Sequence, residues 1–335
     1  MVEQNRTEPR PQQSRRVVIA GGNGQVGQAL ARHFHRRGDA VVILARRESQ
    51  SKPGSTVVWD GINLGAWADE LEDADVLINL AGRSVNCRYN EANRRAIMDS
   101  RIITTKLLGR ARASLKRLPR IWMNARTATI YRHELVRPMD ERIGEIGGRE
   151  VNAPSTWRFS VEVATKWEEA PFSASTLGVR KIALRSAMTM SPDRGGIFDV
   201  LLRLVRFGLG GASGSGQQFV SWIHEADFVA AIEYLIAHDE LDGAVNISSP
   251  GPLPNREFMR ALCEAWGTGI GLPATELMLE AGAVFLRTET ELILKSRRVI
   301  AGRLLESGFR FKFPEWPAAA SDLVAQWRKS GSGAS

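Results

Sequence analysis

The chain is poor in the residues that build disulfide frameworks, metal centres and membrane spans. Its 335 residues include two cysteines, Cys87 and Cys263, and five histidines. Two cysteines so far apart exclude a disulfide scaffold and fit a reducing compartment. No histidine lies in a metal-binding motif such as HExxH, and no apolar run approaches the roughly 18 residues of a membrane helix. We therefore expect a cytoplasmic protein, monomer or homodimer, without a metal or a membrane partner.

The positive charge is concentrated in one segment. The net charge is +8, and residues 83–120 hold eleven lysines and arginines against Glu91 and Asp99. Such a segment can bind an anionic partner, although a solvated helix face is the simpler interpretation. Few aromatic residues interrupt the charges, so base stacking is not indicated and we expect no nucleic-acid partner. The polar residues 1–15 predict a disordered tail.

A glycine-rich turn stands near the start of the chain. The apolar run 17–20 predicts a buried strand and leads into Gly21-x-x-Gly24-x-x-Gly27, which is followed by a helical pattern. The first glycine permits a tight turn, the second lets the backbone approach a diphosphate, and the third lets helix and strand pack closely. The free N–H groups of the helix start, at Gln25 and Val26, would face the anion.

The second predicted strand, 40–47, indicates which dinucleotide is bound. It ends in Arg46-Arg47, where an NAD enzyme usually carries an acid for the ribose 2′-hydroxyl. Guanidinium groups suit a 2′-phosphate, so the sequence favours NADP over NAD. Two ordinary surface arginines are the alternative. Small residues also close the fourth predicted strand at 79–82, where Leu80, Ala81 and Gly82 would let the backbone touch the adenosine half.

Strands continue to alternate with helices. Strands are predicted at 56–61, 73–82, 120–125 and 179–187, with helices at 91–117 and 160–170 between them. This alternation predicts an α/β fold with a Rossmann-type doubly wound parallel sheet. We expect residues 16–190 with about 219–248 to form the nucleotide domain, and 191–218 with 249–330 to form a smaller C-terminal substrate lobe.

The second half adds a glycine loop and two further strand patterns. Five glycines between 208 and 216 predict a mobile loop, interpreted as a lid over the active site. FVSWIH (219–224) predicts a strand. The alternating Phe309, Phe311 and Phe313 predict another short strand with one apolar face.

The chain resembles the atypical, extended short-chain dehydrogenases/reductases, an epimerase-like group with its own C-terminal domain. The resemblance lies in IAGGNGQVGQALA, VVWDG, ADVLINLAG, DSRIITTKLL, TKWEEA, LRSAM, GLGGASGSGQQFVSWIHEADFV, GAVNISSPGPLPNREF and RLLESGFRFKFP. It implies an extended reductase fold, NADP as cofactor and a lobe that closes over the nicotinamide. Members of this group are named epimerases by similarity, and no common substrate is established for them, so the resemblance does not specify the substrate of this chain.

The resemblance also implies a catalytic tyrosine with a lysine four residues on, and this chain lacks that pair. Its three tyrosines are Tyr89, Tyr131 and Tyr234, and none precedes a lysine by four. The turn TATIYR (127–132) is similar to the SATVYG turn of sugar epimerases, which would place Thr127 at the hydroxyl position and near the cofactor, with Tyr131 close by. A packed, structural Tyr131 is the alternative.

Two departures affect the same region. Arg126 and Arg132 stand where small residues are usual, and they would either narrow the pocket or bind an anionic group. The resemblance also implies that epimerases acting on UDP-sugars carry an arginine just before the 219–224 strand to hold the diphosphate. Here the corresponding residues are Gln217, Gln218 and Ser221, which weakens the case for a nucleotide-sugar substrate.

Glu162 stands four residues before Lys166, where the tyrosine should be. The pair is either a substituted acid–base pair or a simple exposed salt bridge, and the spacing favours the salt bridge. Lys166 could still reach the nicotinamide ribose, and Ser160 is a further candidate on the same helix. His224 is expected to be buried and hydrogen-bonded rather than catalytic.

Two functions therefore remain open. The first is an NADP(H)-dependent oxidoreductase or epimerase-like enzyme with a small-molecule substrate and a displaced proton donor. The second is a catalytically degenerate NADP-binding sensor or interaction protein, for example one related to cell division.

Overall fold

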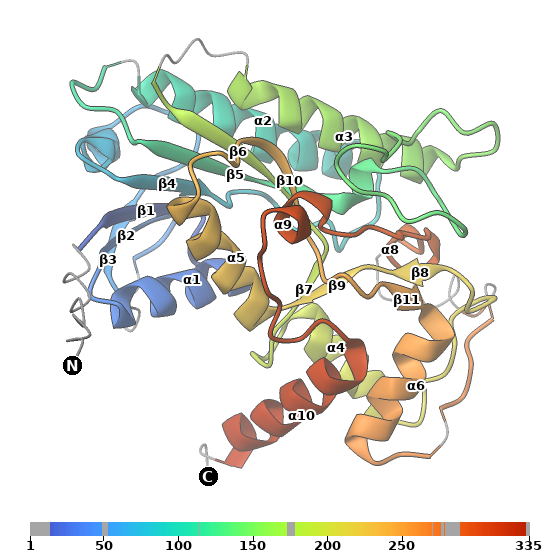
Figure 1. Cartoon of the computed structure of the whole chain (residues 1–335). Coiled ribbons are helices and arrows are strands. Elements are labelled where there is room, and N and C mark those ends of the chain that lie inside the picture. Colours follow the sequence, from blue (N-terminus) through green and yellow to red (C-terminus); the bar gives the residue numbers. More distant parts are fainter. Residues whose placement is uncertain are drawn as a thin grey trace, which may run out of the picture.

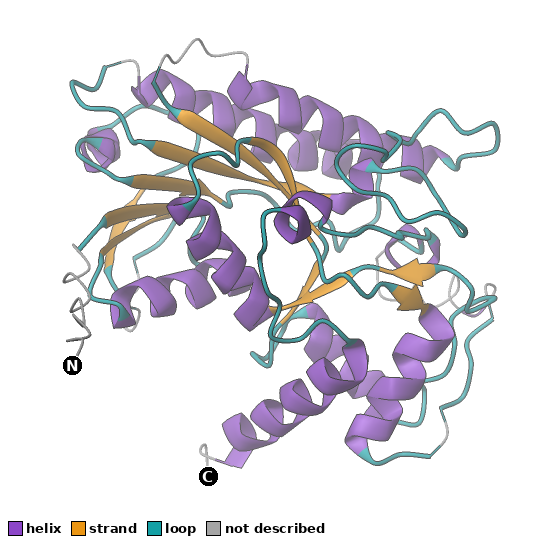
Figure 2. Cartoon of the chain, in the orientation of Figure 1, coloured by secondary structure: helices purple, strands orange, loops and turns teal. Residues whose placement is uncertain are grey.

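A seven-stranded parallel sheet organises the chain (Figures 1 and 2). The computed structural model describes residues 14–48, 53–112, 114–172, 178–269, 271–275, 278 and 289–332. The strand order is β10-β6-β5-β4-β1-β2-β3. The strands are β1 (Arg16–Ala20), β2 (Ala40–Ala45), β3 (Ser55–Val58), β4 (Val76–Asn79), β5 (Ile121–Thr127), β6 (Arg180–Ser186) and β10 (Gly243–Ile247). This order confirms the predicted Rossmann-type fold, with the switch of direction between β1 and β4.

Helices cover both faces of the sheet. α1 (Gln25–Arg36) and α5 (Glu225–Ala237) lie on one face, and η1 (Ala66–Leu71), α2 (Glu91–Arg112) and α3 (Ser155–Phe172) on the other (Figure 1). Both faces of the central strands are therefore buried, which explains their continuous apolar sequences. β3 ends at Val58 rather than at the predicted residue 61, and the N–H of Trp59 makes one last hydrogen bond to the carbonyl of Ala45 at 3.0 Å.

A smaller lobe packs beside the carboxyl ends of the strands. It contains α4 (Ile197–Arg206), α6 (Asn255–Trp266) and α10 (Trp316–Ser332), which share a core around Trp222 and Trp316. Two small sheets join it to the rest, and short helices lie between. These elements are β7 (Met188–Met190) with β9 (Trp222–His224), β8 (Phe219–Val220) with β11 (Leu253–Pro254), η2 (Ala128–Ile130), α8 (Glu291–Leu294) and α9 (Gly302–Glu306). Across the described residues, no helix combines the length and apolar character needed to cross a bilayer.

Two expectations for the second half need correction. The predicted strand at 219–224 is divided between β8 and β9, and neither joins the seven-stranded sheet, so only α5 and β10 of the 219–248 segment lie on it. The predicted strand at Phe309–Phe313 is wrong. Phe309 is buried in the sheet core and Phe313 in the core of the smaller lobe, so the alternation reflects a connection between two cores rather than a strand.

The glycine loop at 208–216 is held to a neighbouring segment. The N–H groups of Gly211 and Gly214 donate to the carbonyls of Leu272 and Ala274, and the N–H of Ala274 donates to Ala212. Gly211 has no room for a side chain, since a Cβ would lie 2.4 Å from the carbonyl carbon of Leu272. The glycines here serve close backbone pairing, and the lid interpretation stays a prediction.

Residues 1–13 of the predicted tail (1–15) lie outside the described residues. Arg15, at the end of the predicted tail, is anchored by side-chain contacts. Arg15 and Arg37 form ion pairs with Glu233 of α5, and His33 of α1 hydrogen-bonds the same carboxylate at 3.3 Å. Burial alone would raise the pKa of Glu233, but the hydrogen bonds from His33 and Arg15 outweigh it and lower that pKa to about 2. One carboxylate thus joins α1, α5 and the start of β1.

We expect Glu233→Gln to lower the free energy of unfolding by on the order of 2 kcal/mol at pH 7. A carboxylate with a depressed pKa stabilises the fold above its unfolded pKa, and this contribution is lost as the pH falls from about 4.5 toward 2. Urea unfolding at pH 7 and pH 3 should therefore show a difference from wild type that narrows at the lower pH. Glu162→Gln, in a half-exposed pair, is the control and should cost less than about 0.5 kcal/mol. A constant difference at both pH values would contradict this assignment.

Candidate functional site: a dinucleotide cleft

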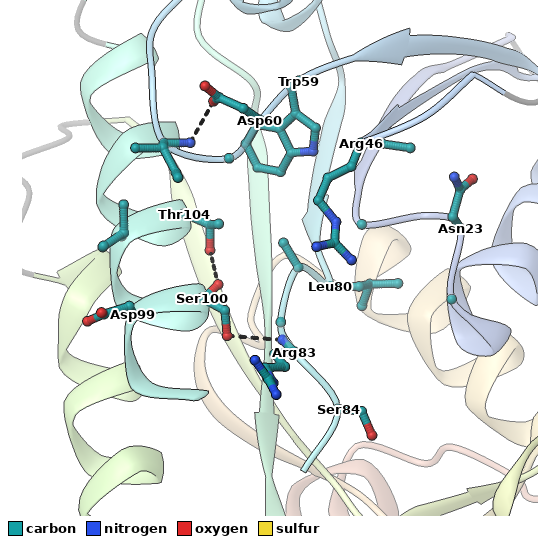
Figure 3. A pocket seen from close by; sticks show the side chains of 18 of the residues that line it. Asn23, Arg46, Trp59, Asp60, Leu80, Arg83, Ser84, Asp99, Ser100 and Thr104 are labelled. Atoms are coloured by element: carbon teal, nitrogen blue, oxygen red, sulfur yellow. Dashed lines mark hydrogen bonds between the residues drawn. The ribbon is translucent and has the colours of Figure 1, made fainter. Parts of the chain in front are cut away.

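A cleft of about 1140 Å³ opens at the carboxyl ends of β1, β2, β3 and β4 (Figure 3). Its walls come from the turns that follow these four strands and from one face of α2. This is the place where open parallel sheets bind ligands, outside the strand ends at the switch point. The lining residues are Gly21, Asn23, Gly24, Ala45, Arg46, Arg47, Trp59, Asp60, Gly61, Ile62, Leu80, Ala81, Gly82, Arg83, Ser84, Ala96, Asp99, Ser100, Ile103 and Thr104.

The glycine turn forms the floor of the cleft, and two of its glycines are required by geometry. Gly21 has φ +76°, and a Cβ there would lie 2.7 Å from the nitrogen of Ala81. A Cβ on Gly27 would lie 2.5 Å from the Cα of Gly22, so α1 can approach the turn only because this residue has no side chain. Gly24 is the N-cap of α1 and contributes no side-chain cap, which leaves the first helical N–H groups available to an anion.

Of the predicted cofactor residues, Gly21, Gly24, Arg46, Arg47, Leu80, Ala81 and Gly82 line the cleft. Gln25, Val26, Gly27 and Thr127 are not among the lining residues. The Gln25 carboxamide donates instead to the carbonyl of Asp193 at 3.2 Å, and Val26 packs against the sheet core. Val26 can therefore contact an anion only through its backbone, whereas the Gln25 carboxamide keeps one N–H donor besides the one bound to Asp193.

Arg46 points into the cleft between Trp59 and Leu80 (Figure 3). It directly follows β2, is exposed, and forms no ion pair or hydrogen bond with the residues that the structure describes. Trp59 is held beside it by an edge-to-face contact with Trp67, with ring centroids 5.1 Å apart. A free guanidinium at this position is available to a charged ligand.

Sequence reasoning missed the wall made by the third strand end and α2. Asp60 accepts hydrogen bonds from the backbone of Ile62 and Asn63, both at 2.8 Å, which fixes the turn after β3 and lowers the Asp60 pKa. On α2, the Ser100 hydroxyl accepts from the N–H of Arg83 at 3.0 Å. The WDG sequence after a strand was a usable signal for the first wall. The second wall depends on packing between distant segments.

Thr127 ends β5 outside the lining of this cleft. Its Oγ1 accepts a hydrogen bond from the N–H of Thr129 at 3.1 Å and caps η2. A hydroxyl that accepts in this way still has its own proton to donate. Thr127 is half-buried, so its hydroxyl can serve a ligand that reaches the end of β5.

Tyr131 is fully buried. Its hydroxyl donates to Oδ1 of Asn246 and accepts from Nη1 of Arg185, each at 2.9 Å. Burial raises the pKa of Tyr131 despite the nearby Arg185. With both hydrogen-bonding functions engaged inside the core, this geometry favours the structural interpretation of Tyr131.

Lys166 faces away from the sheet. Its Nζ lies 2.6 Å from Oε1 of Glu162, and both side chains are about half exposed. The salt-bridge interpretation of this pair is therefore confirmed. Ser160 instead turns toward the C-terminal part of the chain, where its hydroxyl donates to Oε2 of Glu291 at 2.6 Å.

A buried polar network surrounds Ser160 and the turn after β5. Glu291 is 1% exposed, and burial raises its pKa. Lys295 is 2% exposed, donates to the carbonyl of Thr129 at 2.9 Å, and has its pKa lowered by burial to about 8. The segment 289–297 therefore closes over the carboxyl end of β5 with ionisable groups that the sequence did not single out.

His224 has the expected structural role. It is 2% exposed, its Nδ1 accepts from the N–H of Ala226 at 3.0 Å as the N-cap of α5, and its Nε2 lies 3.1 Å from Asp322. The ring stacks on Phe313, and burial lowers its pKa. Both ring nitrogens are thus engaged in holding the two lobes together.

Residues 17–248 match the NAD dependent epimerase/dehydratase family, and residues 274–323 match a domain of unknown function, DUF1731. The first match spans more than half of the chain. This chain belongs to the NAD dependent epimerase/dehydratase family. The epimerase family protein SDR39U1 of Homo sapiens is 30% identical over 92% of this chain and its own full length. Epimerase family protein YfhF of Bacillus subtilis is 29% identical over 92% of this chain and 98% of its own length.

Solved structures agree with this family assignment. The crystal structure of human SDR39U1 with NADPH has a TM-score of 0.80 at 28% identity, covering 92% of this chain and 99% of that one. UDP-N-acetylglucosamine 4-epimerase from Bacillus cereus has a TM-score of 0.71 at 17% identity, over 94% and 97% of the two chains, which shows the shared fold alone. Within this epimerase/dehydratase fold, the chain keeps the dinucleotide cleft and lacks the tyrosine–lysine pair.

We expect Tyr131→Phe to reduce stability rather than function. The change removes the hydroxyl that pairs with Nη1 of Arg185 and Oδ1 of Asn246, which should lower the free energy of unfolding by about 1–3 kcal/mol. Urea unfolding measures this loss, and nucleotide titration of the same variant should be unchanged. The control is Tyr234→Phe, which removes a half-buried hydroxyl bonded to the carbonyl of Ser307 and should cost less. Normal stability with impaired turnover would restore Tyr131 as a catalytic residue.

Proposed function

We propose that this epimerase/dehydratase family member binds NADP(H) in the cleft and uses it for oxidoreductase or epimerase-like chemistry on a small molecule. The observation that carries the proposal is Arg46, a free guanidinium that points into the cleft at the end of β2. The ribose 2′-phosphate of NADP belongs at this strand end, where an acid would instead favour NAD. The NADPH complex of human SDR39U1, a relative along nearly the whole chain, supports the same cofactor.

The residues present fit each part of the cofactor. Gly21 and Gly24 allow the diphosphate to approach the backbone at the start of α1, where the free N–H groups lie. Ile62 and Ile103 give the cleft exposed apolar walls suited to an adenine ring. When bound, the nicotinamide supplies the position that gives or accepts a hydride.

The missing tyrosine is replaced, in this proposal, by groups at the end of β5. We expect the Thr127 hydroxyl to donate to a substrate oxygen, which is the role that the sequence hypothesis gave it. Ser160 of α3 and Glu291 of α8 form a hydrogen-bonded pair, and burial raises the pKa of Glu291, which favours a carboxyl group that holds a proton more readily than one at the surface. Lys166, held by Glu162 on the outer face of α3, has no part in this arrangement.

A nucleotide-sugar substrate is not favoured. Gln218 and Ser221 are buried and hydrogen-bond the carbonyls of Ser213 and Arg297, so neither side chain is available to a diphosphate. The comparisons give no support to the sensor alternative.

Titration with NADPH and NADH, followed by nucleotide fluorescence, tests the cofactor. Arg46→Ala should weaken NADPH binding by roughly 10- to 100-fold, because a charge-assisted hydrogen bond to phosphate is worth about 1.5–3 kcal/mol. Binding of NADH should change little. Arg310→Ala removes an exposed arginine outside the cleft and serves as the control. Equal weakening of both nucleotides, or no binding by the wild type, would contradict the proposal.

A screen of carbonyl substrates with NADPH oxidation as readout tests the chemistry. Thr127→Val should reduce kcat by about 10²-fold or more while leaving NADPH affinity within a factor of two, because only the substrate oxygen loses its partner. Thr56→Val, which changes a threonine of β3 away from the cleft, is the matched control. Full turnover in Thr127→Val would remove Thr127 from the mechanism.

A further inference from the structure

Two guanidinium groups pack against the indole of Trp167, next to Gly82 of the cleft wall. The Cζ atoms of Arg101 and Arg126 lie 5.0 Å and 4.8 Å from the centre of the Trp167 ring. The three side chains come from α2, β5 and α3, so they meet only in the folded protein. This cluster lies outside the cofactor contacts proposed above.

Arg126 is the unusual member of this cluster. It is 4% exposed, and its Nε and Nη2 atoms are buried without a hydrogen-bond partner, while Nη1 donates to the carbonyl of the adjacent Ala125. Arg132, the other arginine of the same turn, forms an ion pair with Glu145 at 2.6 Å. Nε of Arg132 is also buried without a partner, but Arg126 has two such nitrogens and forms no ion pair with the described residues.

The surrounding carboxylates do not balance the charge. Glu168 is the carboxylate that acts on Arg126, and it is already bound by two nitrogens of Arg185. Burial lowers the pKa of Arg126 to about 9 and that of Arg101 to about 10. A buried cation without a counter-charge destabilises the protein, so an unpaired guanidinium at this depth requires a reason.

The cluster borders the cleft directly. A Cβ on Gly82 would lie 3.4 Å from the Cζ of Arg101, and Gly82 is an exposed residue of the cleft wall. Arg101 is itself only partly buried and follows Ser100, another lining residue. Arg101 therefore packs directly behind Gly82 of the cleft wall, and Arg126 contacts the same indole deeper in the protein.

We infer that Arg126 and Arg101 form an anion-binding subsite, which holds a carboxylate or phosphate group of the substrate. This inference rests on the proposed function, since it names the substrate class of the same site. Guanidinium groups match both anions with paired hydrogen bonds, and both of them are packed against Trp167. The substrate is accordingly an acidic small molecule.

The test is urea unfolding of the full chain at constant ionic strength, in chloride and with added malonate or inorganic phosphate. For the wild type we expect a saturable rise of the midpoint with malonate or phosphate, with and without saturating NADPH. Arg126→Met should weaken the apparent anion affinity about tenfold or more. In chloride alone its midpoint should equal or exceed that of the wild type, because an unpaired buried charge has been removed.

Arg112→Met is the matched control. Arg112 is also a buried arginine stacked on a tryptophan, with its Cζ 4.8 Å from the Trp122 ring, and it ends α2 rather than bordering the cleft. This variant should keep the full response to malonate and phosphate. Loss of the response in Arg112→Met, or its persistence in Arg126→Met, would show that the effect is general and overturn the subsite.

Three further outcomes would also overturn it. A lower midpoint of Arg126→Met in chloride would show that Arg126 is a structural residue. Displacement of NADPH by the anions would assign the pair to a cofactor phosphate instead of the substrate. A wild type without any anion response would leave the subsite without a ligand. Failure to bind NADPH, by contrast, sinks the proposed function alone, because the anion response is measured separately.

Discussion

The close approach of α1 to the turn after β1 is the constraint on which the rest of the structure depends. Gly27 of α1 lies against Gly22 of this turn with no room for a Cβ. Gly21 of the same turn lies similarly close to Ala81, in the turn after β4. This contact aims the start of α1 at the cleft and fixes the spacing of the turns that follow β1 and β4. Any side chain at these positions would separate helix and sheet, and the cleft would lose the floor on which a diphosphate can lie.

Local patterns were sufficient to predict the nucleotide half of the molecule. Gly21, Gly24, Arg46 and the small residues 80–82 each lie within a few residues of a strand end, and all of them line the cleft. Contacts between distant segments could not be predicted in this way. Ser160 meets Glu291 across 131 positions, and nothing in either local sequence encodes the pairing. The alternation of Phe309 and Phe313 was misleading because each ring enters a different core.

The surface position of Lys166, four residues after Glu162, has a different explanation. On α3, Phe159, Val163 and Trp167 are buried at helical spacing, and this apolar face was legible in the sequence. Glu162 and Lys166 lie on an exposed flank beside this face, so their four-residue spacing describes a surface pair and not a catalytic one. A motif comparison that ignores helix phase assigns chemistry to the wrong side of the helix. Ser160, two positions earlier than Glu162, is the residue whose side chain enters the interior.

The basic segment illustrates how burial changes the meaning of charge. Some of its arginines are neutralised at the surface, as Arg95 is by Glu91 and Arg117 by Asp73. Others, Arg101 among them, pack against tryptophan faces and bring positive charge into the protein. Aromatic stacking offsets only part of the desolvation cost of a buried cation. The rest of that desolvation cost remains as uncompensated positive charge beside the cleft, and the negative charge of an acidic substrate would compensate it on binding.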